Sequence, residues 1–301
     1  MIKTTLFENH GYTIMDRIGK GGFSCCYKVL SQKYNDYFVG KIIEIDGDYM
    51  KLQKINSYYD EIKSLMNLDH PNIIKIYDTF HDDNYFVVIL EYCSGGDLDN
   101  FIRSNKSLRP SLQISIIDQM ISSIAFCHSR EIAHHDIKPS NFFFDHYSRL
   151  KLADFGISQI KECLHTKNYC GSFVYAAPEL LAKTPYNPYK ADIWSLGVTI
   201  MQFVTLTLPK ADESKDQYFS RMHDQLKAMN DEIPTCIKHI IKRCLVINPD
   251  ERADICELYE YIKPFNVRQQ KKPHRSSAIL ANICTWKNFT KTLSSSFDPI
   301  H

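Results

Sequence analysis

Short stretches rich in β-branched and aromatic residues dominate the first third of the chain. They cover residues 12–18, 26–30, 37–43, 73–80 and 85–91, with turn-forming residues between them, and this pattern predicts five β-strands. Residues 48–68 instead carry apolar side chains three and four positions apart, which is typical of a helix. The first third is therefore predicted to be a β-rich unit with one main helix.

The pattern becomes mainly helical after the break at Ser94-Gly95-Gly96. Apolar residues recur at helical spacing over 111–128, over 191–205 and in further segments up to Tyr261, and residues 150–153 form one predicted strand. This order predicts an α+β fold in which a small β-rich lobe precedes a larger α-helical lobe, with a cleft between them.

Composition and charge narrow the classes of function. Of the 301 residues, 44% are hydrophobic and 24% are charged, as in an ordinary soluble globular protein. The 36 Lys and Arg residues balance 35 Asp and Glu residues, so no overall field favours nucleic acid or an anionic membrane. No apolar run is long enough to span a bilayer, and residues 1–11 lack a signal-peptide pattern. The ten cysteines are scattered without zinc-type spacing, which favours reduced thiols and a cytoplasmic location.

A glycine-rich turn joins the first two predicted strands. It consists of Gly19, Lys20, Gly21, Gly22, Phe23 and Ser24. Glycines let backbone N–H groups approach phosphates without interference from side chains. Taken by itself, however, the motif fits an ordinary structural hairpin equally well. No predicted helix follows the turn directly, which argues against a dinucleotide-binding turn.

Lys41 lies inside the apolar strand predicted at 37–43. A lysine that points inward is costly to bury without a partner. A carboxylate such as Glu61, on the predicted helix, together with an anionic ligand would offset that cost. The alternative is that Lys41 lies on an exposed face of the strand.

Asp136, Lys138 and Asn141 crowd one short segment, and Asp154 follows the predicted strand at 150–153. The oxygen atoms of Asn141 and Asp154 are hard ligands, of the kind that Mg²⁺ takes alongside phosphate oxygens. Asp136 could accept or orient a hydroxyl proton, and Lys138 could neutralise a transferring phosphoryl group. Their spacing matches a catalytic signature and disfavours an ordinary polar surface loop.

These motifs occur in the order and at the spacing of eukaryotic protein kinases, which the chain resembles from Tyr12 to Phe265. The resemblance also rests on Leu68–Ile73, Glu91-Tyr92-Cys93, Asp154-Phe155-Gly156, Ala177-Pro178-Glu179, Asp192–Gly197, and Arg252 after Asn248-Pro249. It implies the two-lobed protein-kinase fold, with an N-lobe at 12–92 and a C-lobe at 93–265. Residues 1–11 would be an N-terminal extension and residues 266–301 a C-terminal tail.

The resemblance implies that the γ-phosphoryl group of ATP is transferred to Ser/Thr hydroxyls of proteins with the help of Mg²⁺. Lys41, paired with Glu61, would hold the α- and β-phosphates. The implied nucleotide-contacting residues are Ile18, Gly19, Lys20, Gly21, Gly22, Phe23, Ser24, Cys26, Val39, Lys41, Leu90, Glu91, Cys93 and Phe143.

The resemblance assigns the chemistry to the second lobe. Asp136 would orient the substrate hydroxyl, and Asn141 and Asp154 would hold Mg²⁺. Glu179 and Arg252 would form a buried structural ion pair, and Asp192, on a central helix, would brace the catalytic segment. Lys138 is typical of serine/threonine kinases, while residues 170–179 and 189–194 are similar to the calcium/calmodulin-dependent-kinase-like group.

The chain departs from the family pattern before Asp136, where His135 replaces the usual Arg. That Arg normally pairs with a phosphate on the activation segment, and the usual phosphate position here is Asn168, which cannot be phosphorylated. We hypothesise that activity does not need a phosphate at that position; the alternative is that a phosphate on the nearby Thr166 takes its place.

Two larger residues line the implied adenine pocket. Val39 stands where Ala is usual, and Phe143 where Leu is usual; overpacking of this kind costs about 1–3 kcal/mol. A pseudokinase or scaffold with weak nucleotide binding is therefore the alternative function. Asp97 could attract a basic substrate residue, but Ser140 replaces a usual Glu, so any such preference should be weak.

The tail combines a basic run at 268–275 with apolar residues at helical spacing over 279–293, including Trp286. A basic amphipathic helix of this kind fits a groove. We expect it to dock on the chain's own large lobe, with autoinhibition or a calmodulin-like partner as the alternative. The basic run is short and adjoins an apolar segment, so no nucleic-acid partner is expected.

Overall fold

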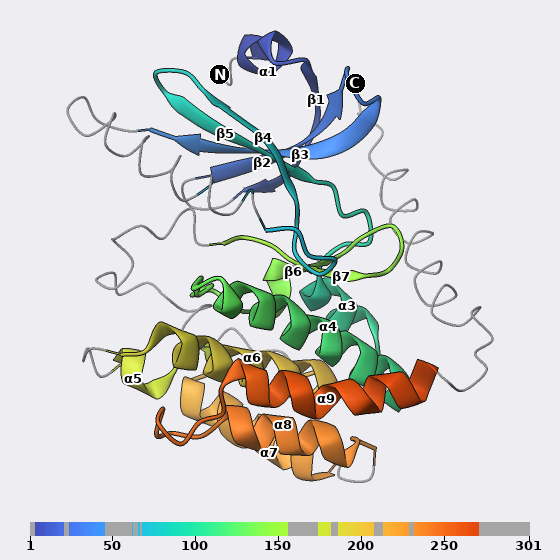
Figure 1. The fold of residues 1–301 in the computed structure, drawn as a ribbon, viewed down its shortest axis with the longest axis vertical. Helices are drawn as coiled ribbons and strands as arrows, with labels where there is room; N and C mark the ends of the chain where they lie inside the picture. The colour runs from blue at the N-terminus through green and yellow to red at the C-terminus, as the bar shows by residue number, and fades with distance from the viewer. Residues whose placement is uncertain are drawn as a thin grey trace. The chain divides into compact units, whose positions relative to one another are not determined.

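The computed structural model describes residues 4–20, 24–45, 62, 66, 68–155, 174–181, 186–207, 213–228 and 232–270. The described residues belong to two compact units, and the chain passes from the first to the second between Cys93 and Ser94. The first unit is mainly strands and the second mainly helices (Figure 1). The predicted α+β class is confirmed.

The small unit contains a five-stranded antiparallel sheet in the order β1-β2-β3-β5-β4. The strands are β1 (Tyr12–Lys20), β2 (Ser24–Ser31), β3 (Asp36–Glu44), β4 (Ile76–His81) and β5 (Tyr85–Glu91). All five predicted strands are present. β4 begins later than predicted because residues 70–73 form a turn, in which the backbone N–H of Ile73 donates to His70. Of the predicted helix at 48–68, only Ile62, Met66 and Leu68 are described; Ile62 and Met66 are helical, and Leu68 is not.

The two faces of the sheet differ in their side chains. Val29, Phe38, Ile42, Val87 and Ile89 belong to one buried apolar cluster. Alternation along a strand places Val39 and Lys41 of β3 on the opposite face from Phe38 and Ile42.

A short helix that the sequence pattern did not predict covers the apolar face. This helix, α1 (Thr4–Asn9), contributes Phe7, which is 1% exposed, to the same cluster. The edge of the Phe7 ring meets Phe80 at a centroid distance of 5.5 Å. Residues 4–11 are thus part of the packed small unit.

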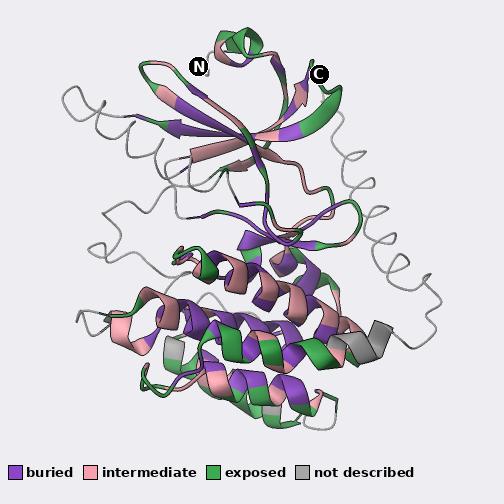
Figure 2. Cartoon of the chain, viewed as in Figure 1, coloured by how far each residue is buried: buried purple, intermediate pink, exposed green. Residues whose placement is uncertain are grey.

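The large unit is built around helix α6 (Pro188–Thr205), which is buried from Ala191 to Thr205 except at Ser195 (Figure 2). It packs against α4 (Pro110–Ser129), α7 (Lys215–Ala228) and α8 (Thr235–Cys244), and α4 also packs against α9 (Ile255–Gln270). The unit further contains α3 (Leu98–Ser104), the 3₁₀ turn η1 (Pro139–Asn141), the hairpin of β6 (Phe142–Phe144) and β7 (Leu150–Leu152), and α5 (Pro178–Leu181). Helix α9 continues past Phe265, and the predicted tail helix at 279–293 lies outside the described residues.

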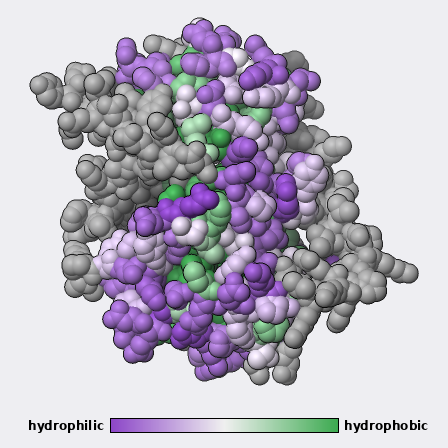
Figure 3. All heavy atoms as spheres, viewed as in Figure 1, coloured by the Kyte–Doolittle hydropathy of each residue, from purple (hydrophilic) through white to green (hydrophobic). Residues whose placement is uncertain are grey.

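Hydrophilic side chains cover most of the described surface on the face shown in Figure 3. Large exposed hydrophobic residues are dispersed along the chain, for example Tyr34, Tyr147 and Ile247. Among the described helices, none combines the length and the apolar character needed to cross a bilayer. No disulfide bond joins the described cysteines.

Gly197 allows α6 and α8 to approach closely. A Cβ atom built on Gly197 would lie 2.5 Å from the Cβ of Cys244 and 2.9 Å from Leu245. Alanine normally stabilises a helix interior relative to glycine. Here the added methyl group would have to push the two helices apart.

We predict that Gly197→Ala lowers the free energy of unfolding by about 1–3 kcal/mol, as overpacking does. Gly19→Ala is a suitable control, since its added Cβ would meet only Cys26 at an ordinary 3.5 Å. Urea unfolding of both variants checks this. A gain in stability for Gly197→Ala would show that helix propensity outweighs the close packing.

Candidate active site

The small unit places several predicted nucleotide-contacting residues on one face of its sheet. Lys41 is 4% exposed and lies between Cys26 of β2 and Val88 of β5, its cross-strand neighbours. Gly19 pairs with Cys26 on the next strand. Lys41 is thus buried, as the inward interpretation predicted, whereas its predicted partner Glu61 lies outside the described residues.

The remaining small-unit residues follow the same register. Val39 is directly opposite Leu90, and both are partly buried. Glu91 ends β5, and its backbone N–H donates to Lys75. Ile18, Lys20, Ser24 and Cys93 are described, while Gly21, Gly22 and Phe23 lie outside the described residues.

In the large unit, the predicted catalytic residues form one hydrogen-bonded group. Lys138 Nζ donates to Asp136 Oδ2 at 2.6 Å. Asn141 Nδ2 donates to the same oxygen at 3.0 Å and to the Asp136 carbonyl at 2.7 Å. The Asp136 carboxylate is partly exposed. The arrangement fixes this carboxylate while leaving it open to a hydroxyl group.

A buried histidine ties this group to the strand that follows. His134 is 1% exposed, and burial lowers the pKa of its imidazole, which favours the neutral ring. Nδ1 accepts from the backbone N–H of Asp136 at 3.3 Å, and Nε2 lies 3.0 Å from the Ala153 carbonyl. Because a carbonyl only accepts, the proton is assigned to Nε2.

Asp154 directly follows Ala153, whose carbonyl contacts His134. Together with Asn141, it provides side chains that fit a magnesium ion. The backbone N–H of Ala153 donates to the Asn141 carbonyl at 2.8 Å, so Asn141 and Asp154 are near neighbours. Both hydrogen bonds of the Asn141 amide use Nδ2, which leaves Oδ1 as its acceptor atom. Asp154 has an exposed side chain and a left-handed φ of 62°. One amide oxygen and one carboxylate suit Mg²⁺, which takes few protein ligands beside phosphate oxygens.

The carboxylate of Asp192, on α6, holds the backbone of the catalytic segment. It is 1% exposed and accepts from the N–H groups of His134 at 2.7 Å and His135 at 2.9 Å. His128 Nε2 at the end of α4 lies 2.9 Å from the same carboxylate. These bonds hold His135 at a φ of 66°, which non-glycine residues rarely adopt. The predicted bracing role of Asp192 agrees with these contacts.

Phe143 and Asp97 lie beside this group in the large unit. Phe143 is partly exposed on β6, on the opposite face from the buried Phe142 and Phe144. Asp97 caps α3, where its carboxylate accepts from the backbone N–H and the side-chain amide of Asn100, both at 2.7 Å. Both oxygens of Asp97 therefore have donors within the chain.

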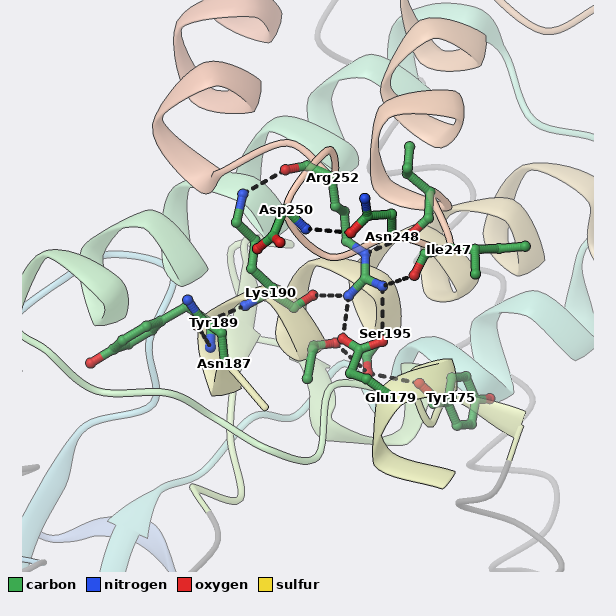
Figure 4. Close-up of polar contacts among 12 residues, drawn as sticks. Tyr175, Glu179, Asn187, Tyr189, Lys190, Ser195, Ile247, Asn248, Asp250 and Arg252 are labelled. Carbon is green, nitrogen blue, oxygen red and sulfur yellow. Dashed lines mark hydrogen bonds and ion pairs between the residues drawn. The ribbon is translucent and has the colours of Figure 1, made fainter. Parts of the chain in front are cut away.

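Glu179 and Arg252 form the ion pair that the resemblance implied, as Figure 4 shows. Arg252 Nη1 and Nη2 donate to the two carboxylate oxygens at 2.7 and 3.0 Å, and the Arg252 side chain is 0% exposed. The guanidinium also donates to the carbonyls of Lys190, Val246 and Ile247. Burial alone would raise the pKa of Glu179, but the hydrogen bonds from Arg252 bring it below its ordinary value. The pair fixes the start of α5 against the α8–α9 loop.

Two polar contacts of this unit were missed by the sequence reasoning. One is His128, whose signal is a histidine in the last turn of an otherwise apolar helix. The other is the bond from the Tyr175 hydroxyl to Gln202 Oε1 of α6 at 2.8 Å, for which no sequence signal existed.

Comparison with known proteins shows the family of the chain. Residues 12–262 match the model of the protein kinase domain. The chain is 30% identical over 83% of its length to the probable serine/threonine-protein kinase MARK-A of Dictyostelium discoideum, of which it covers 24%. It is 31% identical over 89% of its length to the CBL-interacting serine/threonine-protein kinase 10 of Arabidopsis thaliana, of which it covers 57%. The chain thus spans less than two thirds of these relatives.

A solved structure gives the same result for the fold. The crystal structure of Rad53 1-466 in complex with AMP-PNP superposes with a TM-score of 0.68 and 25% identity, covering 84% of this chain and 65% of that one. The fold and the arrangement around Asp136 define a protein kinase domain. The chain belongs to the protein kinase family.

We predict that Glu179→Gln lowers the free energy of unfolding at neutral pH by about 3–5 kcal/mol, because it leaves a buried guanidinium without its anion. The folded-state pKa of Glu179 is below its ordinary value. The ion pair therefore stabilises the fold above the ordinary carboxyl pKa, and this contribution is lost as the pH falls through the folded-state pKa.

Urea unfolding of the wild type and Glu179→Gln over a series of pH values measures this. The stability difference should shrink as the solution becomes acidic. Glu260→Gln is the matched control, because Glu260 pairs only loosely with Lys263 at 3.8 Å and is 71% exposed. A difference between wild type and Glu179→Gln that stays constant with pH would contradict the assignment.

Proposed function

We propose that this protein is a serine/threonine protein kinase that transfers the γ-phosphoryl group of ATP to protein hydroxyls with Mg²⁺. The observation that carries the proposal is the hydrogen-bonded group of Asp136, Lys138 and Asn141, with Asp154 beside it. The named serine/threonine kinases among its relatives support the same activity.

The chain's own residues account for the chemistry by position and charge. Asp136 would accept a hydrogen bond from the substrate hydroxyl and orient its oxygen for attack. Lys138, 2.6 Å from Asp136, would stabilise the negative charge that develops on the transferring group. Mg²⁺ held by Asn141 and Asp154 would neutralise phosphate charge, and Lys41 would bind the phosphates.

Three finer assignments are part of the proposal. The residues at 170–179 and 189–194 support a place near the calcium/calmodulin-dependent-kinase-like group. The absence of disulfide bonds among the described cysteines supports a cytoplasmic location. The roles given to the tail, which are docking on the large lobe, autoinhibition and binding of a calmodulin-like partner, stay predictions.

The alternative of a pseudokinase rested on Val39 and Phe143. Both are partly exposed, and no comparison favours that alternative. All charged groups that the family chemistry needs are in the sequence. We therefore favour the enzyme.

The roles proposed for Asp136, which accepts from the substrate hydroxyl, and for Asp154, which binds Mg²⁺, can be distinguished by experiment. Asp136→Asn should lower the rate of phosphate transfer to a peptide about 10²- to 10⁴-fold, since it removes the acceptor for the hydroxyl proton, while thermal stabilisation by ATP and Mg²⁺ persists. Asp154→Asn should remove the part of that stabilisation that depends on Mg²⁺.

A radiolabelled-ATP assay and a thermal-shift series with and without Mg²⁺ check both results. Asp224→Asn, an exposed carboxylate on α7, is the control and should change neither. A folded wild type that neither responds to ATP with Mg²⁺ nor transfers phosphate would favour the scaffold instead.

We also propose that activity does not require a phosphate on the activation segment. Asn168 and Thr166 lie outside the described residues. The support comes from His135, whose side chain is exposed while its backbone N–H is held by Asp192. The segment before Asp136 thus has an anchor that does not depend on a phosphate.

Treatment of the purified protein with a phosphatase should then leave its specific activity unchanged, because no phosphate orders the activation segment. Thr166→Val, assayed in parallel, should behave in the same way. Loss of activity on dephosphorylation, restored when a phosphate is returned to Thr166, would refute this regulation without refuting the kinase activity.

A further inference from the structure

Helix α1 packs on the side of the sheet opposite the predicted nucleotide-contacting residues of β3. Its end is fixed by hydrogen bonds from His10 to the Phe7 carbonyl at 3.1 Å and from Gln32 to the Gly11 carbonyl at 2.9 Å. The His10 ring stacks on Phe80 with a centroid distance of 4.1 Å and an interplanar angle of 6°. The path of residues 4–11 across the sheet is therefore well defined.

The Phe7 ring lies directly on the backbone of β3 at Gly40. A Cβ atom built on Gly40 would come within 2.5 Å of Phe7 Cε1 and 3.0 Å of Cζ, far closer than real atoms approach. Only glycine leaves room for the ring here. The two residues, distant in the sequence, form one complementary contact that includes a segment outside the matched kinase domain at 12–262.

Gly40 is flanked by Val39 and Lys41, whose side chains lie on the other face of the strand. Lys41 is 4% exposed, so the position of its side chain depends on the position of the β3 backbone. A glycine has more backbone freedom than any other residue. Without the Phe7 ring, β3 would lose the packing contact at Gly40, which lies between Val39 and Lys41.

We propose that Phe7 is a positioning residue for Lys41: by packing on Gly40, α1 holds the centre of β3 in the place that nucleotide binding requires. This inference rests on the proposed function only in its assignment of Lys41 to the phosphates. It gives residues 4–11 a role in ATP affinity as well as in packing.

The test uses the full chain and steady-state kinetics with ATP and a peptide substrate. Phe7→Ala should raise KM for ATP about tenfold, a change of about 1.4 kcal/mol in binding, and change kcat less than about twofold. Phe7→Leu, which keeps an apolar side chain at the contact, should recover most of the affinity. Binding of ADP with Mg²⁺, measured by calorimetry, should weaken in parallel.

Gly40→Ala tests the contact from its other side. The added methyl group should displace the ring and raise KM for ATP by itself. In the double variant Phe7→Ala/Gly40→Ala, the methyl group occupies part of the vacated space, so the effects should be less than additive. This coupling remains measurable in Phe7→Leu/Gly40→Ala if Phe7→Ala does not fold.

Ile237→Ala on α8 is the control for a loss of stability alone. Ile237 is 0% exposed in the large unit, and its truncation should lower the melting temperature without changing KM for ATP. Equal KM values for the wild type, Phe7→Ala and Gly40→Ala would overturn the inference while leaving the kinase activity intact. A wild type without phosphate transfer would instead refute the proposed function, and ADP calorimetry would still decide the role of Phe7.

Discussion

The active-site geometry depends most on the hydrogen bonds accepted by the buried carboxylate of Asp192. Asp192 lies at the start of the most buried helix of the large unit and accepts N–H donors from His134 and His135. A carboxylate this deep is costly unless hydrogen bonds satisfy it. Its partners are therefore strongly specified, and they are the two residues directly before Asp136.

From this anchor the remaining geometry follows in short steps. The neutral His134 ring bonds on one side to Asp136 and on the other to Ala153. Asn141 bonds to Asp136 through its amide and to Ala153 through its carbonyl. These bonds fix Asp136, which would meet the hydroxyl, relative to Asn141, which would hold magnesium. Both residues lie in the large unit.

The sequence predicted the parts of this arrangement that leave a periodic or local signal. The five strands were predictable because β-branched and aromatic runs alternate with turns. The apolar strand around Lys41 left two interpretations open, a buried and an exposed side chain, and the buried one is observed. The group around Asp136 and Asp154 was predicted because its members lie close together in the chain or follow a family motif. Helix α1 was not predicted, because it spans six residues and buries only Phe7. One buried residue gives no periodic signal.

Contacts between distant residues were the other part that sequence patterns could not supply. The fit of Phe7 to Gly40 depends on the courses of helix α1 and strand β3, and a single glycine in a strand pattern does not say what covers it. His128 likewise became informative only once α4 and α6 were packed together. The ion pair of Glu179 and Arg252 was identified before the structure only through the family resemblance.

The central claim is that Asp136, Asn141 and Asp154, which lie together in the large unit, form a site for Mg²⁺ and the substrate hydroxyl. A crystal structure of the protein with Mg²⁺ and a non-hydrolysable ATP analogue measures this directly. We predict that Asn141 Oδ1 and Asp154 are bound to the metal ion, beside the phosphates of the analogue. A nucleotide seated elsewhere, or a crystal grown at saturating nucleotide in which side chains fill that space, would contradict it.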